Sequence, residues 1–440
     1  MPPAVHVSLA ALVCAGALAA SEVAPLADPF AGASELNRAA LVAQVLARNP
    51  SLEAARQALE AARARPTRMT ALEPPMLSYA MAPRSIGAAV PFGQEIEISQ
   101  PLPYPGRRRL TNDAAAAEVE VAAADLSLLV IELERRAAEL YADLYLAHRA
   151  GDINAEHAAL LEEFKQVATA RYAAGLASQQ DPLAAEAEVA HLQHDGLLLR
   201  SERAIVEARI NALLHREPGA ALPAPPSMLA PAASSAGSGD PDLAVLAERA
   251  LAERPELRRA DALVRARQAE LDLAKFAGRP DLAVSTSYNS MWSDGEHRWM
   301  VGAAIGLPFW RQRVRAGAAE AEGRLAVARA ERETLADEVR REVAEAAVRW
   351  HETHHVLELF PSRLLPVARD RVEAALAGFR TGQNDFLALV EAERALRDVT
   401  LDYHRALAGQ ERSRAALAAA LGDTAATAAG APPHAPGESR

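Results

Sequence analysis

The sequence predicts a mostly helical, elongated protein that contains one helix–β-hairpin–helix unit in two copies. Half of its 440 residues are apolar, yet only 4% are aromatic, and alanine supplies much of the apolar fraction. Such a composition is typical of long helices packed closely side by side. The net charge is −11 and Lys and Arg form no dense tract, which argues against nucleic-acid binding.

The duplication is visible as short motifs that recur at one spacing. LARNPSLEAAR begins at Leu46 and LAERPELRRAD at Leu251, while QPLPYPGRRR from Gln100 resembles GLPFWRQRVR from Gly306. Pro50 lies 205 positions before Pro255, and the Leu-Pro-aromatic triplets of the second motif keep the same offset. Matches in order at one unchanged offset predict a repeated unit.

Each copy predicts the same order of elements: a helical stretch, two strands and two long helices. The first copy covers 36–216, with strands at about 76–102 and helices at about 107–170 and 183–215. The second covers 243–421, with strands at about 280–309 and helices at about 314–377 and 386–421. The Pro/Ala/Ser-rich segment 217–242 predicts a linker, and 422–440 predicts a disordered tail.

The predicted strands have one apolar face. In Met300–Leu307 the odd positions are Val301, Ala303, Ile305 and Leu307, and they are opposed by the small residues Gly302, Ala304 and Gly306. A period of two with one apolar face is typical of a half-buried strand. A small or charged opposite face also fits the lumen of a membrane barrel. The pattern leaves a soluble β-sandwich and a membrane barrel both open.

The predicted helices are long and carry apolar stripes. Arg107–Ala150 has no glycine or proline, and 44 helical residues at about 1.5 Å each would run roughly 65 Å. The apolar residues recur every three or four positions, as in a coiled coil. The stripe of the first long helix comprises Leu126, Val130, Leu133, Ala137, Leu140 and Leu144. The stripe of the second comprises Leu335, Val339, Val343, Ala347 and Trp350. A soluble antiparallel bundle explains the helices equally well, but not the two inserted strand pairs.

The N-terminus predicts export. Val7–Ala20 is apolar and ends in small residues, with Ala17-Leu18-Ala19 as an A-x-A cleavage site, so we expect residues 1–20 to be a signal peptide. The one cysteine, Cys14, lies inside it. We interpret Cys14 as part of the signal rather than as a lipid anchor, because Val13 occupies the position where such anchors need a small residue. The mature chain therefore has no disulfide.

Rigid corners join the strands to the long helices. Pro103, Pro105 and Gly106 form the first corner and Pro308 lies in the second. Proline ends strand pairing because it lacks an N–H, and glycine permits a sharp bend. Arginines 107–109 follow, although cations at a helix start oppose the helix dipole. Anionic lipid headgroups or a solvated basic patch both account for them.

With these motifs, the sequence resembles the TolC-type outer-membrane efflux protein family across nearly the whole mature chain. The resemblance is carried by Leu46–Arg56 and Leu251–Asp261, the ISQPLPYPGRRR corner, and the turns Tyr172–Asp181 and Phe379–Asp385. The PLPYPG corner looks most like the heavy-metal branch, whose members serve cation-exporting resistance–nodulation–division pumps.

The resemblance implies a homotrimer in the Gram-negative outer membrane, with most of its mass in the periplasm. Each chain would give four strands to a 12-stranded β-barrel in contact with outer-membrane lipid, continued by a long periplasmic α-helical barrel. Such a duct works with a periplasmic adaptor protein and an inner-membrane resistance–nodulation–division transporter. It has no cofactor and no catalytic site.

The resemblance also places both turns at the periplasmic tip. Asp385 matches a carboxylate ring that narrows the pore, and Asp181 matches an aspartate of the polar network at the tip. The other tip residues are Tyr172, Gly175, Phe379, Gly382, Gln383 and Asn384. The chain departs from the family in having Ala388 and Asn384 where some members have a carboxylate and an arginine. Both aspartates also suit helix N-caps.

Neither an enzyme nor a metal site is predicted. The sequence shows no Ser/His/Asp set and no glycine-rich phosphate loop. His351 and His355, with His354 between them, have a spacing compatible with a metal, but no third ligand backed by a carboxylate is evident, so we favour a solvated helix face. The same holds for His191 and His194. The alternative function is a soluble periplasmic coiled-coil scaffold or adaptor.

Overall fold

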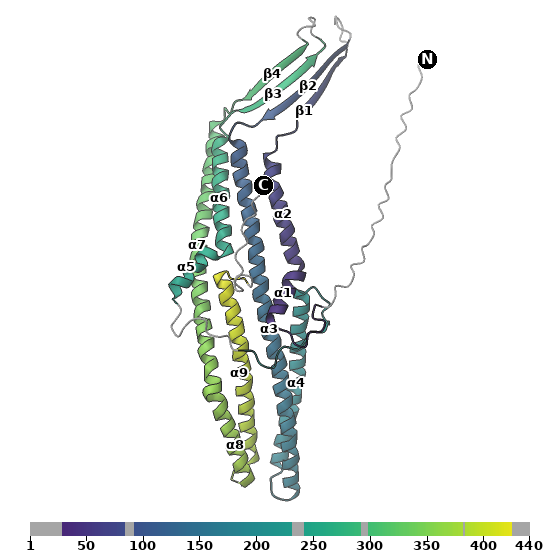
Figure 1. The fold of residues 1–440 in the computed structure, drawn as a ribbon, viewed down its shortest axis with the longest axis vertical. Helices are drawn as coiled ribbons and strands as arrows, with labels where there is room; N and C mark the ends of the chain where they lie inside the picture. The colour runs from purple at the N-terminus through teal and green to yellow at the C-terminus, as the bar shows by residue number, and fades with distance from the viewer. Residues whose placement is uncertain (1–28, 84–91, 231–241, 292–297, 382, 425–440) are drawn as a thin grey trace, which may run out of the picture.

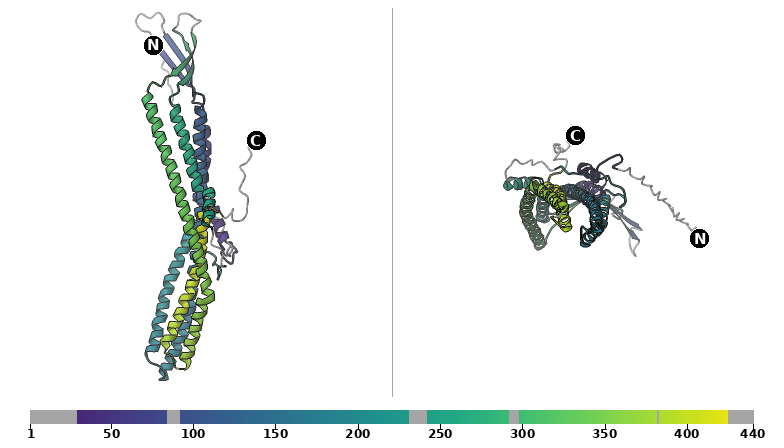
Figure 2. Two further views of the ribbon diagram at one scale, coloured as in Figure 1. Left: turned by 90° about the vertical axis from the view of Figure 1, so that its left-hand side faces the viewer. Right: turned by 90° about the horizontal axis from the view of Figure 1, so that it is seen from below.

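The computed structural model describes residues 29–83, 92–230, 242–291, 298–381 and 383–424. The molecule is elongated, with one β-sheet at one end and helices along the rest of its length (Figure 1). Both helical hairpins end at the far tip, and the described helices form a curved layer when viewed along the long axis (Figure 2). The mostly helical class expected from the sequence is therefore correct.

The two halves of the chain have matching element orders. The first half comprises α1 (Arg38–Arg48), α2 (Pro50–Thr70), β1 (Met76–Pro83), β2 (Phe92–Leu102), α3 (Arg107–Ala173) and α4 (Gln180–Leu213). The second half comprises α5 (Leu243–Glu253), α6 (Pro255–Phe276), β3 (Asp281–Asn289), β4 (Trp299–Gly306), α7 (Arg311–Leu359), the π-helical segment η2 (Phe360–Leu364), α8 (Leu365–Thr381) and α9 (Phe386–Leu421).

One difference separates the halves. The counterpart of the continuous helix α3 is divided into α7 and α8 by the π-helical turn η2. Pro361 lies within this turn, and a proline removes one backbone donor from a helix and displaces the preceding carbonyl. The sequence predicted a single helix here, because an isolated proline in an apolar pattern does not show whether a helix ends or only widens.

The four strands form one antiparallel sheet in the order β1-β2-β3-β4, so β2 and β3 join the two halves. The register aligns Ile96 with Tyr288 and Thr286 with Val301. One face is consequently mostly apolar; it contains Leu77, Tyr79, Met81, Ile96, Ile98, Leu282, Val284, Tyr288, Trp299, Val301 and Ile305. The opposite face is mostly small or polar; it contains Ser78, Ala80, Glu95, Glu97, Ser99, Ser285, Ser287, Gly302 and Ala304.

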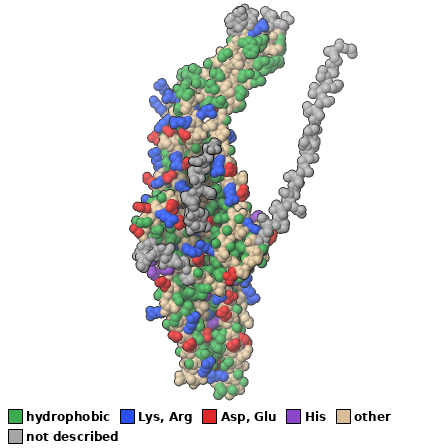
Figure 3. All heavy atoms as spheres, in the orientation of Figure 1, with side chains coloured by type: hydrophobic (Ala, Val, Ile, Leu, Met, Phe, Trp, Pro, Cys, Tyr) green, Lys and Arg blue, Asp and Glu red, His purple; other side chains and the backbone are tan. Residues whose placement is uncertain are grey.

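The sheet and the helices differ in their surfaces. Val301 is 89% exposed, and all of β4 is exposed. In the face shown by Figure 3 the sheet end carries mainly hydrophobic and uncharged side chains, whereas both signs of charge are mixed over the helices. The described residues include no helix with the length and apolar character needed to span a membrane.

The main core lies at mid-height, where α1 and the segment after α4 cover α3. The predicted stripe on α3 contributes Leu133, Ala137, Leu140 and Leu144 as buried residues, with Leu126 and Val130 packed against them. The described part of the predicted linker is attached to this core: Leu229 is buried, and the Asn211 amide donates to the carbonyls of Pro218 and Ala220. Residues 231–241 lie outside the described chain.

The first strand-to-helix corner contains a left-handed glycine. Strand β2 continues through Pro101 to Leu102. Pro103 and Pro105 then precede Gly106, whose φ is +97° at the N-cap of α3. Because only glycine adopts this conformation without strain, Gly106 sets the angle at which α3 leaves the sheet. Pro308 lies between β4 and α7.

The arginines after this corner have protein partners. Arg107 Nη1 lies 3.0 Å from Asp281 Oδ1, and Arg108 Nε donates to the Thr70 carbonyl at 2.8 Å. The corner is further packed by Tyr104 and Phe276, whose rings meet edge-on at 5.7 Å. Arg107 therefore links the start of α3 to β3, and Arg108 links it to the end of α2.

We expect Gly106→Ala to lower the thermal unfolding midpoint, since a left-handed conformation costs an alanine about 1–2 kcal/mol. The measurement is circular dichroism at 222 nm on the purified full-length protein. Gly317→Ala is the matched control: Gly317 lies within α7 and an added Cβ meets no atom within 4 Å. The control should be neutral or stabilising. Equal destabilisation by both substitutions would contradict this account of the corner.

Candidate functional site at the helical tip

One apolar cluster joins the tips of both helical hairpins. It contains Leu161 and Ala168 of α3, Ala185, Val189 and Leu192 of α4, Ala375 and Phe379 of α8, and Phe386, Leu389, Val390 and Ala392 of α9. The rings of Phe379 and Phe386 are 5.7 Å apart, and Phe164 packs edge-on against Phe386 at 6.5 Å. The two repeats therefore end in one packed unit rather than in two independent hairpins.

The first-repeat turn is closed by Gly175. Its φ is +71°, and its N–H donates to the Tyr172 carbonyl while the Leu176 N–H donates to the Arg171 carbonyl. These bonds satisfy the last carbonyls of α3 in the manner of a glycine C-cap. Tyr172 is 45% exposed and Leu176 is 70% exposed, so the turn presents apolar surface to its surroundings.

Asp181 does not cap α4, contrary to the N-cap interpretation of the sequence. It lies inside the first turn of the helix, whose N-cap is Gln179. The Ser178 hydroxyl donates to Asp181 Oδ1 at 3.0 Å and accepts from the Gln180 N–H at 3.2 Å. A carboxylate in the first turn still interacts favourably with the helix dipole.

Asp385, by contrast, is the N-cap of α9. Its Oδ1 accepts from the Ala388 N–H at 3.0 Å. The Gln383 and Asn384 N–H groups both donate to the Gly378 carbonyl. The Asn384 side chain lies so close to Gly378 that an added Cβ would be 2.3 Å from Asn384 Nδ2. Gly382, the remaining predicted tip residue, lies outside the described residues.

An arginine that the sequence did not single out links the two turns. The Arg171 guanidinium lies over the Phe379 ring at 4.5 Å, and its Nη1 donates to the Phe379 carbonyl at 3.3 Å. Such cation–π contacts contribute about 0.5–1 kcal/mol at exposed sites. The position of Arg171 immediately before Tyr172 was the available signal, but its partner is 208 residues away in sequence.

Buried polar groups lie above the apolar cluster. Glu188 of α4 is buried and pairs with Arg394 of α9. Glu393 is also buried, and burial raises the pKa of its carboxyl. His157 of α3 is 8% exposed; burial, aided by the nearby Arg397 guanidinium, lowers its pKa to about 4. The His157 side chain is therefore neutral in the folded, packed state at neutral pH.

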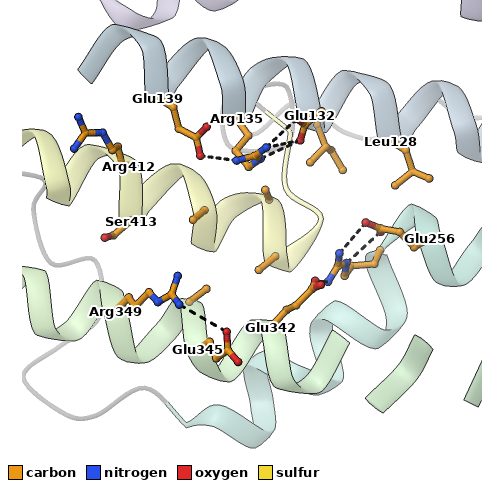
Figure 4. Close-up of a pocket in the computed structure, with 16 residues that line it drawn as sticks. Leu128, Glu132, Arg135, Glu139, Glu256, Glu342, Glu345, Arg349, Arg412 and Ser413 are labelled. Atoms are coloured by element: carbon orange, nitrogen blue, oxygen red, sulfur yellow. Dashed lines mark hydrogen bonds and ion pairs between the residues drawn. The ribbon is translucent and has the colours of Figure 1, made fainter. Parts of the chain in front are cut away.

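A cavity of about 670 Å³ lies at mid-height among α3, α6, α7 and α9, away from the tip. Figure 4 shows Arg135 between Glu132 and Glu139. Arg254 pairs with Glu256 at 2.7 Å. Arg254, which is 7% exposed, also reaches Glu342 at 2.6 Å. These cations are held by carboxylates of the same cavity: Arg135 by two of its own helix α3, and Arg254 by two of the second repeat.

His157 makes the tip sensitive to acid. Its folded pKa of about 4 lies below the ordinary histidine value of 6.5, so protonation favours the unfolded state. Its contribution to stability is complete above pH 6.5 and declines as the pH falls toward 4. We expect the thermal midpoint of the wild type to fall over this window.

The matched variants separate His157 from other acid effects. His157→Gln should reduce the pH dependence between 6.5 and 4, whereas His191→Gln, at an exposed position of α4, should leave it unchanged. An identical pH profile for wild type and His157→Gln would show that His157 is not a source of the acid sensitivity.

The chain is similar to known proteins both in part of its sequence and in its fold. Residues 246–423 match the sequence model of the outer membrane efflux protein family. The fold is similar to that of the outer-membrane channel OprN, with 23% identity, a TM-score of 0.76, and coverage of 88% of this chain and 89% of OprN.

Two further solved structures share the fold. CusC, whose structures are described in terms of folding and transmembrane channel formation, is 19% identical to this chain with a TM-score of 0.76. The match covers 88% of this chain and 92% of CusC. The outer membrane protein VceC from Vibrio cholerae has 18% identity, a TM-score of 0.74, and coverage of 88% and 96%, respectively. No curated protein sequence matches significantly.

Proposed function

We propose that the chain forms the outer-membrane channel of a tripartite efflux system, because residues 246–423 match the outer membrane efflux protein family. It is a passive duct and not an enzyme. A periplasmic adaptor protein and an inner-membrane resistance–nodulation–division transporter deliver its substrates. The observation that carries this proposal is the exposed two-faced sheet at one end of a long helical body.

The sheet supports a closed trimeric barrel. Its edge strands β1 and β4 each pair on one side only within the described chain. Unpaired strand edges are unfavourable in lipid, where every backbone polar group needs a partner. Three copies with four strands each would close a 12-stranded barrel, in which β4 of one copy pairs with β1 of the next.

The two faces of the sheet suit the two sides of such a wall. The face with Val301, Ile305 and Ile98 would contact lipid, and the face with Glu95, Glu97 and Ser285 would line the aqueous lumen. A soluble periplasmic scaffold or adaptor, the alternative, leaves this exposed apolar face without a role. The helical body would then lie in the periplasm of a Gram-negative cell.

Membrane localisation and assembly test this proposal. After expression in a Gram-negative host, the full chain should fractionate with the outer membrane and elute as a trimer in detergent. A monodisperse, water-soluble monomer would refute the channel function.

In such a barrel, a charged substitution should be tolerated less well on the lipid-facing side of a strand than on the side that faces the lumen. Val301→Arg should reduce the yield of assembled trimer, because an arginine facing lipid near mid-membrane costs about 2–4 kcal/mol. Ala304→Arg is the control on the opposite face of the same strand, and it should reduce the yield much less. Equal yields, measured by heat-modified gel mobility of outer-membrane fractions, would show that the wall or its register is wrong.

We further propose that the tip residues form the pore constriction. In a trimer, three copies of Asp385 would surround the axis and attract cations into a narrow opening. Asp181 belongs to the polar surroundings of this constriction, with Tyr172, Gly175, Phe379, Gly382, Gln383 and Asn384 shaping the turns. The described apolar packing of Phe379 and Phe386 would hold the constriction closed.

Two substitutions separate the charge of Asp385 from its capping role. Asp385→Asn keeps an N-cap acceptor and removes the charge, so cation selectivity and block by trivalent cations should fall in planar-bilayer recordings at unchanged thermal stability. Asp385→Ala should do the same and also lose about 0.5–2 kcal/mol of stability. If selectivity and block stay at the wild-type level in Asp385→Asn, the carboxylate is a cap and not a filter.

Heavy-metal cations are the substrate class that we propose. This assignment is supported by the resemblance of the PLPYPG corner at Pro101–Gly106 to the heavy-metal branch. Deletion of the chain's gene in its host should sensitise cells to copper, silver, zinc or cobalt salts more than to organic drugs. The opposite order of sensitivities would assign the channel to a drug pump.

A further inference from the structure

A pair of histidines near the end of α7 has the geometry of a metal chelate. Nε2 of His351 and Nε2 of His355 share a hydrogen bond of 2.9 Å, which a metal ion would replace, and the rings meet nearly at right angles, with centroids 4.3 Å apart. Among the described residues, no group of three or more His, Cys, Asp and Glu side chains is placed to hold a metal. An ion bound here would therefore have two protein ligands and water.

The nitrogen–nitrogen distance favours one coordination geometry. Imidazole nitrogens bind first-row metals at about 2.0–2.1 Å. Two such nitrogens at a right angle around the ion would be about 2.9 Å apart, and two at a tetrahedral angle about 3.3 Å apart. The observed 2.9 Å matches the right-angle arrangement that is typical of copper(II) and nickel(II).

Glu358 stands behind one of the two rings. Its Oε2 lies 3.7 Å from Nδ1 of His355, the nitrogen on the other side of the ring from Nε2. Metal-binding histidines are commonly oriented by a carboxylate on their second nitrogen. The carboxylate was present in the sequence three residues after His355, but only the structure shows which ring nitrogen it lies nearest.

His354 belongs to a different contact and is not a ligand. Its Nδ1 lies 3.2 Å from the Gln410 amide of α9, and its Nε2 lies 3.6 Å from Glu358 Oε1. Its ring stacks on Trp350 with an interplanar angle of 29°. The His354 side chain is 25% exposed and that of His355 is 59% exposed, so the neighbouring histidines face different surroundings.

We propose that His351 and His355 form a surface site for a divalent copper or nickel ion, with Glu358 as the residue that positions His355. The site is independent of the pore and of the substrate that the channel carries. The chelate would bridge one turn of α7, directly before the π-helical segment Phe360–Leu364. Because the ion binds the folded helix, it should also raise the thermal midpoint.

The test uses the full-length detergent-purified protein without a polyhistidine tag. Isothermal titration with NiCl₂ measures stoichiometry and affinity, and electron paramagnetic resonance of the CuCl₂-loaded protein detects nitrogen ligands. The wild type should bind one ion per chain with two nitrogen ligands at this site. His351→Ala and His355→Ala should each abolish the tight phase and the two-nitrogen signature.

Two further variants make the result specific. His354→Ala, the matched control, should keep affinity and spectrum. Glu358→Gln should keep both nitrogen ligands but weaken binding by about 10-fold, the lower end of the effect of second ligand-sphere substitutions. Circular dichroism of each variant reports whether the helices remain intact.

The proposal is overturned by any of three outcomes. The first is wild-type binding that is unchanged in the His351→Ala/His355→Ala double variant. The second is a loss in His354→Ala equal to that in His355→Ala. The third is a copper spectrum without nitrogen ligands. A nickel-dependent rise of the thermal midpoint that persists in the double variant would place the ion elsewhere on the chain.

Discussion

The pairing of β2 with β3 is the interaction on which the rest of the structure depends. It joins two strands that are nearly 200 residues apart in the chain, aligning Glu95 with Asn289 and Leu102 with Leu282. Because side chains alternate between faces along a strand, a slip by one residue would reverse the faces of half the sheet. The single register that is present places the apolar residues of all four strands together. The sheet can therefore serve as one wall segment.

The long helices carry this arrangement to the opposite end of the molecule. Each repeat leaves the sheet through a proline-containing corner and returns as a helical hairpin, so an error in the exit angle would grow along the length of α3. Gly106, Arg107 and Arg108 set and hold that angle at the start. At the tip, the Phe379–Phe386 contact and the Arg171 guanidinium over Phe379 bring the hairpins together again. The repeats are consequently joined at both ends and, through the ion pair of Arg412 in α9 with Asp143 in α3, between these ends.

Charged and polar residues have two different roles in this framework. Buried groups such as Glu188, with its partner Arg394, connect helices and are costly to leave unpaired. Exposed groups at the tip, including Asp385, satisfy local backbone donors and are available for a further role in an assembly. The His351–His355 pair belongs to neither group, because its two ring nitrogens approach each other on the surface of one helix.

By itself, the sequence determined the class of elements and their order. Apolar residues that recur every two positions mark the apolar face of a strand, and a recurrence of about 3.6 positions marks that of a helix. Both patterns are local, because they depend only on residues close together in the chain. Thus the faces of Met300–Leu307, the stripe from Leu133 to Leu144 and the repeat of the Leu-Pro-aromatic corner could all be read from the chain. The family resemblance then indicated where the functional end lies.

Only the tertiary structure decided which distant residues meet. Arg171 and Phe379 are brought together by the packing of two hairpins, and no local pattern encodes a contact over 208 residues. The roles of Asp181 and Asp385 also diverged, although both precede or begin a helix in similar motifs: Asp181 accepts from the Ser178 hydroxyl, whereas Asp385 accepts from the Ala388 N–H. The π-helical turn at Pro361 and the attachment of Leu229 to the core likewise depend on neighbouring segments. Local sequence sets the propensity of an element, whereas its partners, and hence its chemistry, are set by the packing of the whole chain.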